Sequence, residues 1–537
     1  MSKPTNPKDG TPKMFEPQLL QAQRLIVATN RGPVEHYVTK NGTLKCRRGS
    51  GGVVTALIDA GRQVEMSWVA MAMTEGDRLA LQGTMQQRLP SSLAGQKMHL
   101  HYVEISREAY RKYYERISNQ LLWFLQHYLY NPTENSRVAQ RFQDAWENGY
   151  CVANRAIAEA VIEEIEGTEG SAVVMLHDYH LYLVPRMIRQ RHPAIVMHHF
   201  IHIPWPDIRC WHFLSSKIAH EIYEGLVGND IIGFQTERDA RNFLEGARTL
   251  LEGARVEFEE GTVEWQGHMT KARSYPISIS GLTELKLVKS AAGKQAAEKL
   301  RPLLGKQTIM RVDRLEPTKN IVRGFQAYDL LLEQHPELHR VVRFLAFLVP
   351  SRQSLPEYQR YAREVKKIIE EVNQKYGTPG WQPITVFYQN DRTQALAAMQ
   401  YYDVLMVNPI IDGMNLVAKE GPVVNQKDGV LLLSRTVGAF PQLGKASVPT
   451  SPIDIGETAE ALYKALTLPE EERHSKATLA RLSVTSQNLD QWIRRQIKDI
   501  NELLVSRSPQ VPAAALPPAC QSVPPQEVAS DWVTNVV

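Results

Sequence analysis

Short apolar runs alternate along the chain with longer stretches in which apolar residues recur at helical spacing. In the first half, strands are predicted at residues 24–29, 67–72, 172–177, 195–201 and 231–235. Helices are predicted at residues 135–166 and 237–251. Near-continuous apolar strands separated by amphipathic helices are typical of a parallel sheet covered on both faces. This half of the chain therefore predicts one doubly wound sheet.

A second series of the same kind follows the extended stretch 275–280. Its strands are predicted at residues 308–312, 341–349, 384–388, 404–407 and 430–434, and its helices at 357–376 and 392–402. The predicted fold class is α/β, with two Rossmann-like doubly wound parallel-sheet domains facing each other across a cleft.

The chain has 537 residues, which is too long for a single hydrophobic core. We expect an N-terminal domain at 21–279, a C-terminal domain at 280–483 and a helix at 484–505 that packs back on the N-terminal domain. The segments 1–20 and 506–537 are expected to be disordered, because they hold too few clustered apolar groups to offset the entropy of ordering.

Net charge and cysteine spacing limit the kinds of binding partner and the cellular compartment that the sequence predicts. The 62 basic and 58 acidic side chains leave a net charge of +4, so no broad positive field predicts binding to nucleic acid or to a membrane. The four cysteines lack C-x-x-C spacing, and no apolar run approaches the ~18 residues of a membrane span. These features predict a cytoplasmic protein. No heptad pattern identifies an oligomer interface, so a homo-oligomer is left open.

Two segments of the second half carry residues suited to a nucleoside diphosphate. Arg314 and Lys319 follow the first predicted strand and can neutralise a departing diphosphate, although two solvated surface charges are the alternative. Asp412, Gly413 and Glu420 follow the apolar run 404–407 at a helix start, where free backbone N–H groups can bind phosphate. Glu420 is placed to hold a ribose hydroxyl. An ordinary turn with a helix cap is the alternative for this loop.

Polar residues of the first half also fall just after predicted strands. Asp178 and His202 are interpreted as contacts to sugar hydroxyls, because a carboxylate and a neutral imidazole suit directional hydrogen bonds. The alternative is a metal site built from the histidines, namely His177, His180, His198, His199 and His202. Neighbouring residues on strands point to opposite faces, so we predict neither a metal nor a cofactor.

The Gly-rich loop 47–52 precedes an apolar helix at 53–60. Such a loop can cradle a phosphate, but this one matches neither the Walker nor the dinucleotide-binding pattern, and a flexible hairpin loop is the alternative. Arg352 follows the strand predicted at 341–349 and is a further candidate cation.

Taken together, these segments resemble the trehalose-6-phosphate synthases, retaining transferases of glycosyltransferase family 20. The similarity is collinear from about residue 24 to residue 497. The matching segments are Tyr114 and Trp123 in Tyr-Tyr-x4-Asn-x3-Trp, His177 to Leu181, His202 to Pro206 with the preceding strand, Gly233 to Thr236, Arg314 with Lys319, Ser351 with Arg352, and Asp412 to Glu420.

The resemblance implies a GT-B fold with the donor held mainly by the C-terminal domain. It implies donor contacts by Arg314, Lys319, His202, Asp412, Gly413, Met414, Asn415, Leu416, Val417 and Glu420, with Gly51 and Gly52 in a mobile donor loop. It implies an acceptor-phosphate site formed by Arg31, Tyr114, Trp123 and Arg352, and acceptor-sugar contacts by Trp68 and Asp178. The partners implied are a nucleoside-diphosphate glucose and glucose 6-phosphate.

The reaction that the resemblance implies is metal-independent transfer of glucose from UDP- or GDP-glucose to glucose 6-phosphate. The product is α,α-trehalose 6-phosphate, and the anomeric configuration is retained. Such a hexosyltransferase works by positioning and electrostatics rather than with a nucleophile of its own. Arg314, Lys319, Asp178 and His202 are its predicted catalytic residues.

Several positions depart from the family pattern. Glu316 and Pro317 replace the usual Asp-Tyr pair, Gly421 replaces an aromatic residue, and the loop 389–392 near the donor base also differs. The segment 68–77 is similar to a branch that includes pseudo-glycosyltransferases, which join a cyclitol nucleotide to an aminocyclitol phosphate. That activity is one alternative, and a non-catalytic sugar-phosphate sensor is another.

Overall fold

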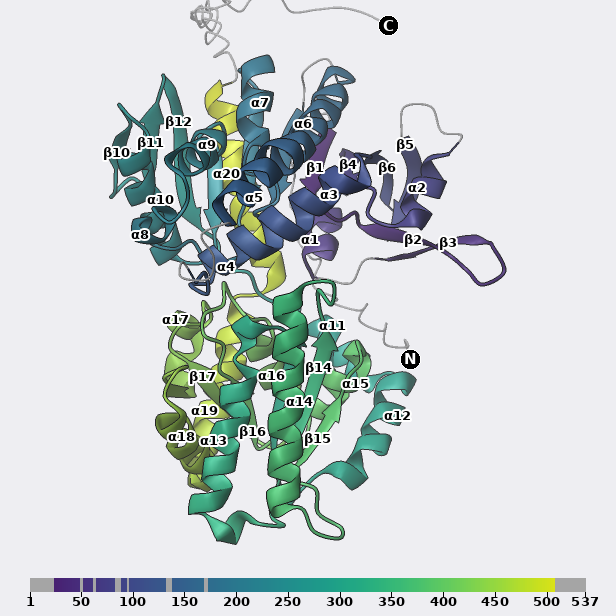
Figure 1. Cartoon of the computed structure of the whole chain (residues 1–537), viewed down its shortest axis with the longest axis vertical. Helices are drawn as coiled ribbons and strands as arrows, with labels where there is room; N and C mark the ends of the chain where they lie inside the picture. The colour runs from purple at the N-terminus through teal and green to yellow at the C-terminus, as the bar shows by residue number, and fades with distance from the viewer. Residues whose placement is uncertain are drawn as a thin grey trace, which may run out of the picture.

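The computed structural model describes residues 24–48, 52–60, 64–82, 88–93, 96–131, 138–168 and 172–507. These residues form two α/β lobes, each built around its own sheet (Figure 1). The segments expected to be disordered, 1–20 and most of 506–537, lie outside the described residues. Among the helices that are described, none is both long enough and apolar enough to cross a membrane.

The first lobe contains a ten-stranded sheet. In spatial order its strands are β10 (Arg255–Glu257), β11 (Thr262–Trp265), β12 (His268–Ser274), β9 (Ile231–Phe234), β8 (Val196–Phe200), β7 (Ala172–His177), β1 (Arg24–Thr29), β4 (Glu65–Met71), β6 (Gln96–Val103) and β5 (Arg88–Leu93). The strands from β12 to β6 are parallel, whereas β10, β11 and β5 are antiparallel additions at the two edges. A separate hairpin, β2 (Val34–Val38) and β3 (Leu44–Arg48), projects from this lobe.

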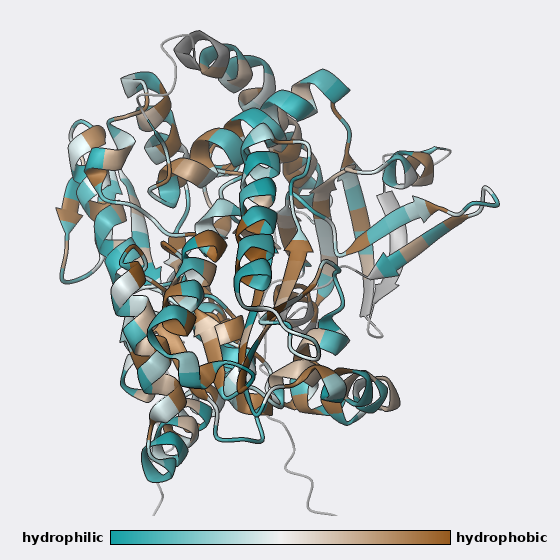
Figure 2. Cartoon of the chain, turned by 60° about the horizontal axis from the view of Figure 1, so that its bottom comes forward, coloured by the Kyte–Doolittle hydropathy of each residue, from teal (hydrophilic) through white to brown (hydrophobic). Residues whose placement is uncertain are grey.

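The second lobe contains six parallel strands. Their order is β15 (Ile384–Phe387), β14 (Val342–Pro350), β13 (Gln307–Leu315), β16 (Val404–Val407), β17 (Val430–Ser434) and β18 (Ser447–Thr450). Figure 2 shows apolar strands surrounded by helices whose outer faces are more polar. The predicted pair of parallel α/β sheets is confirmed.

Helices cover both sheets. Those of the first lobe are α1 (Gly52–Ala60), α2 (Glu75–Leu81), α3 (Arg107–Arg111), the π-helix η2 (Lys112–Leu122), α4 (Trp123–Gln126), α5 (Val138–Ala145), the π-helix η3 (Trp146–Tyr150), α6 (Cys151–Glu166), α7 (Val184–Arg191), α8 (Ile208–Trp211), α9 (Ser216–Leu226) and α10 (Glu237–Leu250). Those that follow in the chain are α11 (Leu282–Lys289), α12 (Ala291–Leu300), α13 (Ile321–Gln334), α14 (Pro356–Tyr376), α15 (Arg392–Met399), α16 (Val417–Val424), α17 (Phe440–Leu443), α18 (Ile455–Thr467), α19 (Glu470–Ser486) and α20 (Leu489–Arg507). In the part of the chain that the structure describes, the 3₁₀ turns are η4 (Arg301–Leu303), η5 (Pro317–Lys319), η6 (Pro336–Leu338) and η7 (Gly444–Ala446).

Several predicted elements have other bounds in the structure, and three of the differences affect how the fold is read. The helix predicted at 135–166 is interrupted by the π-helix η3, and its described part begins at Val138. The strand predicted at 308–312 runs on to Leu315, so Arg314 lies in β13 rather than after it. The helix predicted at 484–505 is divided, because α19 ends at Ser486 and the side chain of Asn488 accepts a hydrogen bond from the backbone N–H of Gln491 at the start of α20.

Helix α20 follows the second lobe in the chain but packs against α1 and β8 of the first. Its buried face carries apolar side chains at helical spacing, which are Leu489, Trp492, Ile493, Ile497 and Ile500. The Trp492 ring meets the ring of Phe200 edge-on, with their centroids 5.1 Å apart. This contact holds α20 under the strand that ends next to the cleft between the lobes.

Candidate active site

A cleft of about 820 Å³ opens between the two lobes at the carboxyl ends of their parallel strands. Its lining includes Arg31, Tyr114, Trp123, Asp178 and His202 from the first lobe. From the second lobe it includes Arg314, Arg352, Asn390, Asp412 and Gly413. Ligands of open parallel sheets bind at this edge, because loops from several strands converge there.

The loop between β16 and α16 brings Asp412 to the floor of the cleft. The Asp412 carboxylate accepts hydrogen bonds from the Lys319 ammonium and, at 3.1 Å, from the side chain of Asn415. Burial alone would raise the pKa of Asp412, but the Lys319 charge outweighs it and holds this pKa below its ordinary value. Asn415 also caps α16 by accepting from the backbone N–H of Ala418 at 3.2 Å. The loop is therefore held by side chains at both of its ends.

Gly413 lies where this loop meets the first lobe. A Cβ at position 413 would lie 2.3 Å from the carbonyl oxygen of His202. Only glycine, which lacks a Cβ, permits this approach. The glycine at this position is therefore needed for packing between the lobes, in addition to the close access for a diphosphate that the sequence suggested.

Arg314 and Arg352 reach the cleft from adjacent strands and share one counter-ion. The Glu316 carboxylate forms an ion pair with Arg314 at 3.0 Å and accepts a hydrogen bond from Arg352 at 3.2 Å. Both guanidinium groups lie over the Trp123 ring, at 5.2 Å and 4.1 Å from its centroid. The predicted donor cation and the predicted acceptor cation are therefore neighbours.

Arg352 is more tightly enclosed than Arg314. It donates to the hydroxyl groups of Tyr358 at 2.7 Å and Tyr179 at 3.3 Å, and its side chain is 11% exposed. The Arg314 side chain is 45% exposed. Tyr179, Tyr358 and Glu316 were not predicted as site residues. Glu316 stands two positions after Arg314, and that proximity was the one signal that could have identified it.

Asp178 and His202 lie at the first-lobe side of the cleft, as their positions after β7 and β8 predict. Asp178 has a positive φ of 74°, and its carboxylate accepts from the backbone N–H of His202 at 3.4 Å. Burial raises the pKa of Asp178 to about 6. Burial also lowers the pKa of His202 to about 3, and its ring nitrogen lies 3.2 Å from that of His177. These imidazoles are neutral at ordinary pH and suit hydrogen bonds with hydroxyl groups.

Trp68 does not line the cleft. It is 1% exposed within the core of the first lobe, and its indole N–H donates to the side chain of Thr29 at 2.8 Å. Thr29 lines the cleft, whereas Trp68 stands behind it. Trp68 is enclosed because β4 is a central strand that is buried on both faces from Met66 to Met71. The contact of Trp68 with an acceptor sugar stays a prediction.

Glu420 belongs to an ion-pair cluster beside the cleft. Arg392 donates to Glu420 at 3.0 Å and to Glu284 at 2.7 Å. Burial raises the pKa of Glu420, although Arg392 opposes this shift. Arg392 follows Asn390, which lines the cleft, so this cluster adjoins the predicted donor side.

The other predicted donor residues occupy several surroundings. Met414 is buried and lines a pocket on the other side of the loop. Leu416 and Val417 pack beside the core at the start of α16. Lys319 is covered by Asp412. Gly52 begins α1, while Gly51 lies outside the described residues. Within the described residues, no group of three or more His, Cys, Asp or Glu side chains has an arrangement that could hold a metal ion.

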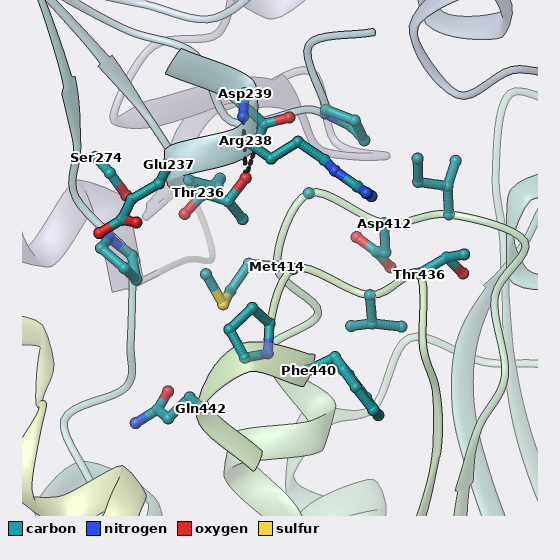
Figure 3. A pocket seen from close by; sticks show the side chains of 18 of the residues that line it. Thr236, Glu237, Arg238, Asp239, Ser274, Asp412, Met414, Thr436, Phe440 and Gln442 are labelled. Carbon is teal, nitrogen blue, oxygen red and sulfur yellow. Dashed lines mark hydrogen bonds between the residues drawn. The ribbon is translucent and has the colours of Figure 1, made fainter. Parts of the chain in front are cut away.

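The pocket behind the loop measures about 740 Å³ and is shown in Figure 3. Arg238 stands on its first-lobe side, and Met414, Thr436 and Phe440 stand on its second-lobe side. Asp412 and Gly413 line both this pocket and the cleft. The loop from Ile411 to Met414 is therefore the partition between them.

Two facing Rossmann-like lobes with a polar, cationic cleft between them form a fold of the GT-B class. The chain belongs to glycosyltransferase family 20, whose model matches residues 23–502. The predicted family is thus confirmed.

The similarity to curated relatives extends along most of the chain. The trehalose-6-phosphate synthase of Mycolicibacterium smegmatis is 30% identical over 87% of this chain and 90% of its own length. The UDP-forming α,α-trehalose-phosphate synthase A of Dictyostelium discoideum is 28% identical over 89% of this chain. The chain spans 62% of the Dictyostelium protein and 60% of a bifunctional trehalose-6-phosphate synthase/phosphatase from Thermoproteus tenax.

The similarity to solved structures also extends along most of the chain. A structure from E. coli described as bound with UDP-2-fluoro glucose is 26% identical, with a TM-score of 0.76 over 89% of this chain and 99% of that one. A UDP-forming α,α-trehalose-phosphate synthase from Burkholderia xenovorans in complex with glucose-6-phosphate is 25% identical. Its TM-score is 0.73 over 89% of this chain and 100% of that one.

Proposed function

We propose that this protein is a retaining hexosyltransferase that transfers glucose from a nucleoside-diphosphate glucose to glucose 6-phosphate. The products are α,α-trehalose 6-phosphate and the free nucleoside diphosphate. The observation that carries the proposal is the convergence of Arg314 and Arg352 on one cleft that also presents Asp178. Two anionic substrates that must meet at one sugar carbon require this arrangement. The relatives described with UDP-2-fluoro glucose and with glucose-6-phosphate support it.

Each side chain has a part in the proposed reaction. The acceptor hydroxyl forms a bond to the anomeric carbon as the bond to the diphosphate oxygen breaks, and the hydroxyl proton passes to the leaving phosphate. Arg314 is the half-exposed cation that faces the growing negative charge. Lys319 is oriented by Asp412 and adds to the positive potential at the loop. Donors of this kind typically contribute about a hundredfold or more to the rate.

The acceptor is proposed to bind on the other side of the same cleft. Arg352 and Arg31 provide its phosphate site together with Tyr114, whose ring stacks on His180 with centroids 5.9 Å apart. Asp178 accepts a hydrogen bond from a sugar hydroxyl once its carboxyl is ionised. We further propose that no metal takes part, because the arginine and lysine side chains supply the positive charge that a divalent ion would supply.

Nucleotide release and product mass test the proposal. UDP-, GDP- and ADP-glucose are each incubated with the protein, with and without glucose 6-phosphate, in buffer containing EDTA. We expect release that depends on the acceptor with at least one donor, and a product with the mass of a phosphorylated disaccharide. Absence of acceptor-dependent release with every donor would overturn the proposal. A cyclitol nucleotide in a parallel reaction tests the pseudo-glycosyltransferase alternative by the mass of its product.

A further inference from the structure

Glu316 is a buried carboxylate that forms ion pairs with two arginine side chains. It ends the segment that contains β13 and precedes Pro317, and its side chain is fully buried. One carboxylate oxygen forms an ion pair with Arg314 at 3.0 Å and accepts a hydrogen bond from the Thr318 hydroxyl at 3.0 Å. The other accepts from Arg352 at 3.2 Å. Both oxygens are therefore used, and each serves a different arginine.

The electrostatics of this group fit an ionised carboxylate. Burial alone would raise the pKa of Glu316, but Arg314 and Arg352 outweigh the burial and lower it. A buried charge is tolerated only when it is paired and hydrogen-bonded, and here Thr318 and Arg352 donate to the carboxylate while Arg314 forms an ion pair with it. The two arginines therefore favour the ionised form of Glu316.

Arg314 and Arg352 are two like charges that contact the same carboxylate. Arg314 and Arg352 would repel each other across the Trp123 ring if no anion stood between them. Glu316 removes that repulsion and fixes both guanidinium groups, while donors of each arginine remain that do not contact Glu316. A flexible side chain held in advance loses less entropy when it binds a phosphate.

We infer that Glu316 is a positioning residue that fixes Arg314 and Arg352 as one unit, so that the donor-diphosphate and acceptor-phosphate subsites depend on the same carboxylate. The inference rests on the proposed function and adds a residue to its site. It predicts that one substitution weakens the binding of both substrates, although Glu316 itself is too deeply buried to touch either.

Separate binding measurements test this prediction. Dissociation constants for UDP and for glucose 6-phosphate are measured by calorimetry with the unaltered protein and with Glu316→Gln. The amide has nearly the shape of the carboxylate but carries no charge, so the repulsion between Arg314 and Arg352 is no longer offset and both guanidinium groups lose their fixed positions. We expect both ligands to bind about tenfold or more weakly, which is the usual effect of losing a hydrogen bond to a charged group.

Two further variants make the result specific. Glu370→Gln removes an exposed carboxylate from α14 that does not line the cleft, and should change neither constant. Glu316→Asp keeps the charge but is one methylene shorter, so it should hold one arginine better than the other and weaken one ligand more than the other. If Glu316→Gln fails to fold, Glu316→Asp decides: unchanged affinity for both ligands would overturn the inference.

The outcomes separate this inference from the proposed function. If the unaltered protein binds neither UDP nor glucose 6-phosphate, the proposed function fails. If the unaltered protein binds both and folded Glu316→Gln binds both equally well, only the role of Glu316 fails. Weakening of a single ligand by Glu316→Gln would also overturn the inference, because Glu316 would then serve one arginine and not the pair.

Discussion

Arg314 and Lys319 have different electrostatic surroundings, although the sequence pattern predicts one role for both. Lys319 is compensated by the Asp412 carboxylate, and its side chain is 11% exposed. Arg314 shares Glu316 with a second arginine and faces the cleft. Removing Lys319 would leave Asp412 buried without its cation, so loss of folding would be mixed with loss of rate. Arg314 gives the cleaner test of charge stabilisation.

Arg314→Ala should lower kcat about a hundredfold or more while the protein still folds. The reason is that the guanidinium acts mainly on charge that develops on the departing diphosphate, and Glu316 retains Arg352 as a partner. Steady-state release of nucleotide measures the rate, and circular dichroism checks the fold. Arg360→Ala, an exposed position on α14, serves as the matched control. A kcat within about threefold of the control would refute the role of Arg314.

Asp178 gives a prediction about stability and pH. Its pKa is raised by burial to about 6, against about 3.9 in an unfolded chain. Between these values the folded protein binds a proton that the unfolded chain does not, so the stability from this group falls as pH rises through the window. Asn is neutral at every pH and tolerates the positive φ.

The melting temperature of Asp178→Asn, relative to that of the unaltered protein, should therefore increase from about pH 4 to about pH 6 and then level off. Thermal unfolding followed by circular dichroism at several pH values measures this difference. The same protocol applied to Asp391→Asn, at an exposed position, controls for the general effect of removing one carboxylate. A difference that stays constant across the window would contradict the raised pKa.

Site residues that follow strands were predictable, and residues that act through others were not. Asp178, His202, Arg352 and Asp412 were all found from their positions after apolar runs, since strand ends meet at one edge of a parallel sheet. Glu316 was recorded only as a departure from a pattern. Arg314 is its neighbour in sequence, but Arg352 comes from a separate segment, and its approach to the same buried carboxylate is decided by tertiary structure.

At the scale of elements, apolar strands were easier to predict than polar ones. The strands β1, β7, β16 and β17 have the predicted bounds, because buried parallel strands are continuously apolar. The hairpin β2–β3 was missed, since its residues are largely exposed and mix polar with apolar types. The break between α19 and α20 was also missed, because a single Asn cap supplies it.

The loop between β16 and α16 provides a prediction at this scale. Gly413→Ala should displace the loop from the carbonyl of His202, because the added Cβ would lie 2.3 Å from that oxygen. Asp412 and the backbone N–H groups of the loop would move with it. We expect kcat to fall about tenfold or more, since small displacements of positioning groups are costly. Nucleotide release in the coupled assay measures the effect.

Gly456→Ala is the matched control for this experiment. Position 456 lies at the start of α18, where an added Cβ would make only an ordinary contact of 3.4 Å with the side chain of Asp454. Its activity should equal that of the unaltered protein. Equal activity of Gly413→Ala and Gly456→Ala would show that the approach of the loop to His202 does not matter for turnover.

At the scale of the whole molecule, several contacts outside the cleft hold the two lobes together. Lys419 of α16 is buried and donates to the carbonyl of Ile277 at 2.7 Å, in the segment that connects the sheets. Gln120 of η2 donates to Glu357 of α14 at 3.1 Å across the cleft edge. Helix α20 adds an apolar contact, because it continues the second lobe in sequence but packs on the first. The relative placement of Asp178 and Arg314 depends on these contacts.

Trp492→Ala tests how far α20 unites the molecule. Trp492 is 2% exposed and lies edge-on to Phe200, the last residue of β8, with its ring 6.4 Å from that of His202. Truncation to Ala should cost about 3–5 kcal/mol, as for other buried aromatic residues. Because the loss falls on the contact between α20 and the first lobe, we expect the lobes to unfold in two resolved calorimetric transitions and turnover to fall. Arg495→Ala, on the exposed face of the same helix, should leave both properties unchanged. A single transition lowered in temperature, with normal turnover, would mean that α20 stabilises the fold without setting how the lobes meet.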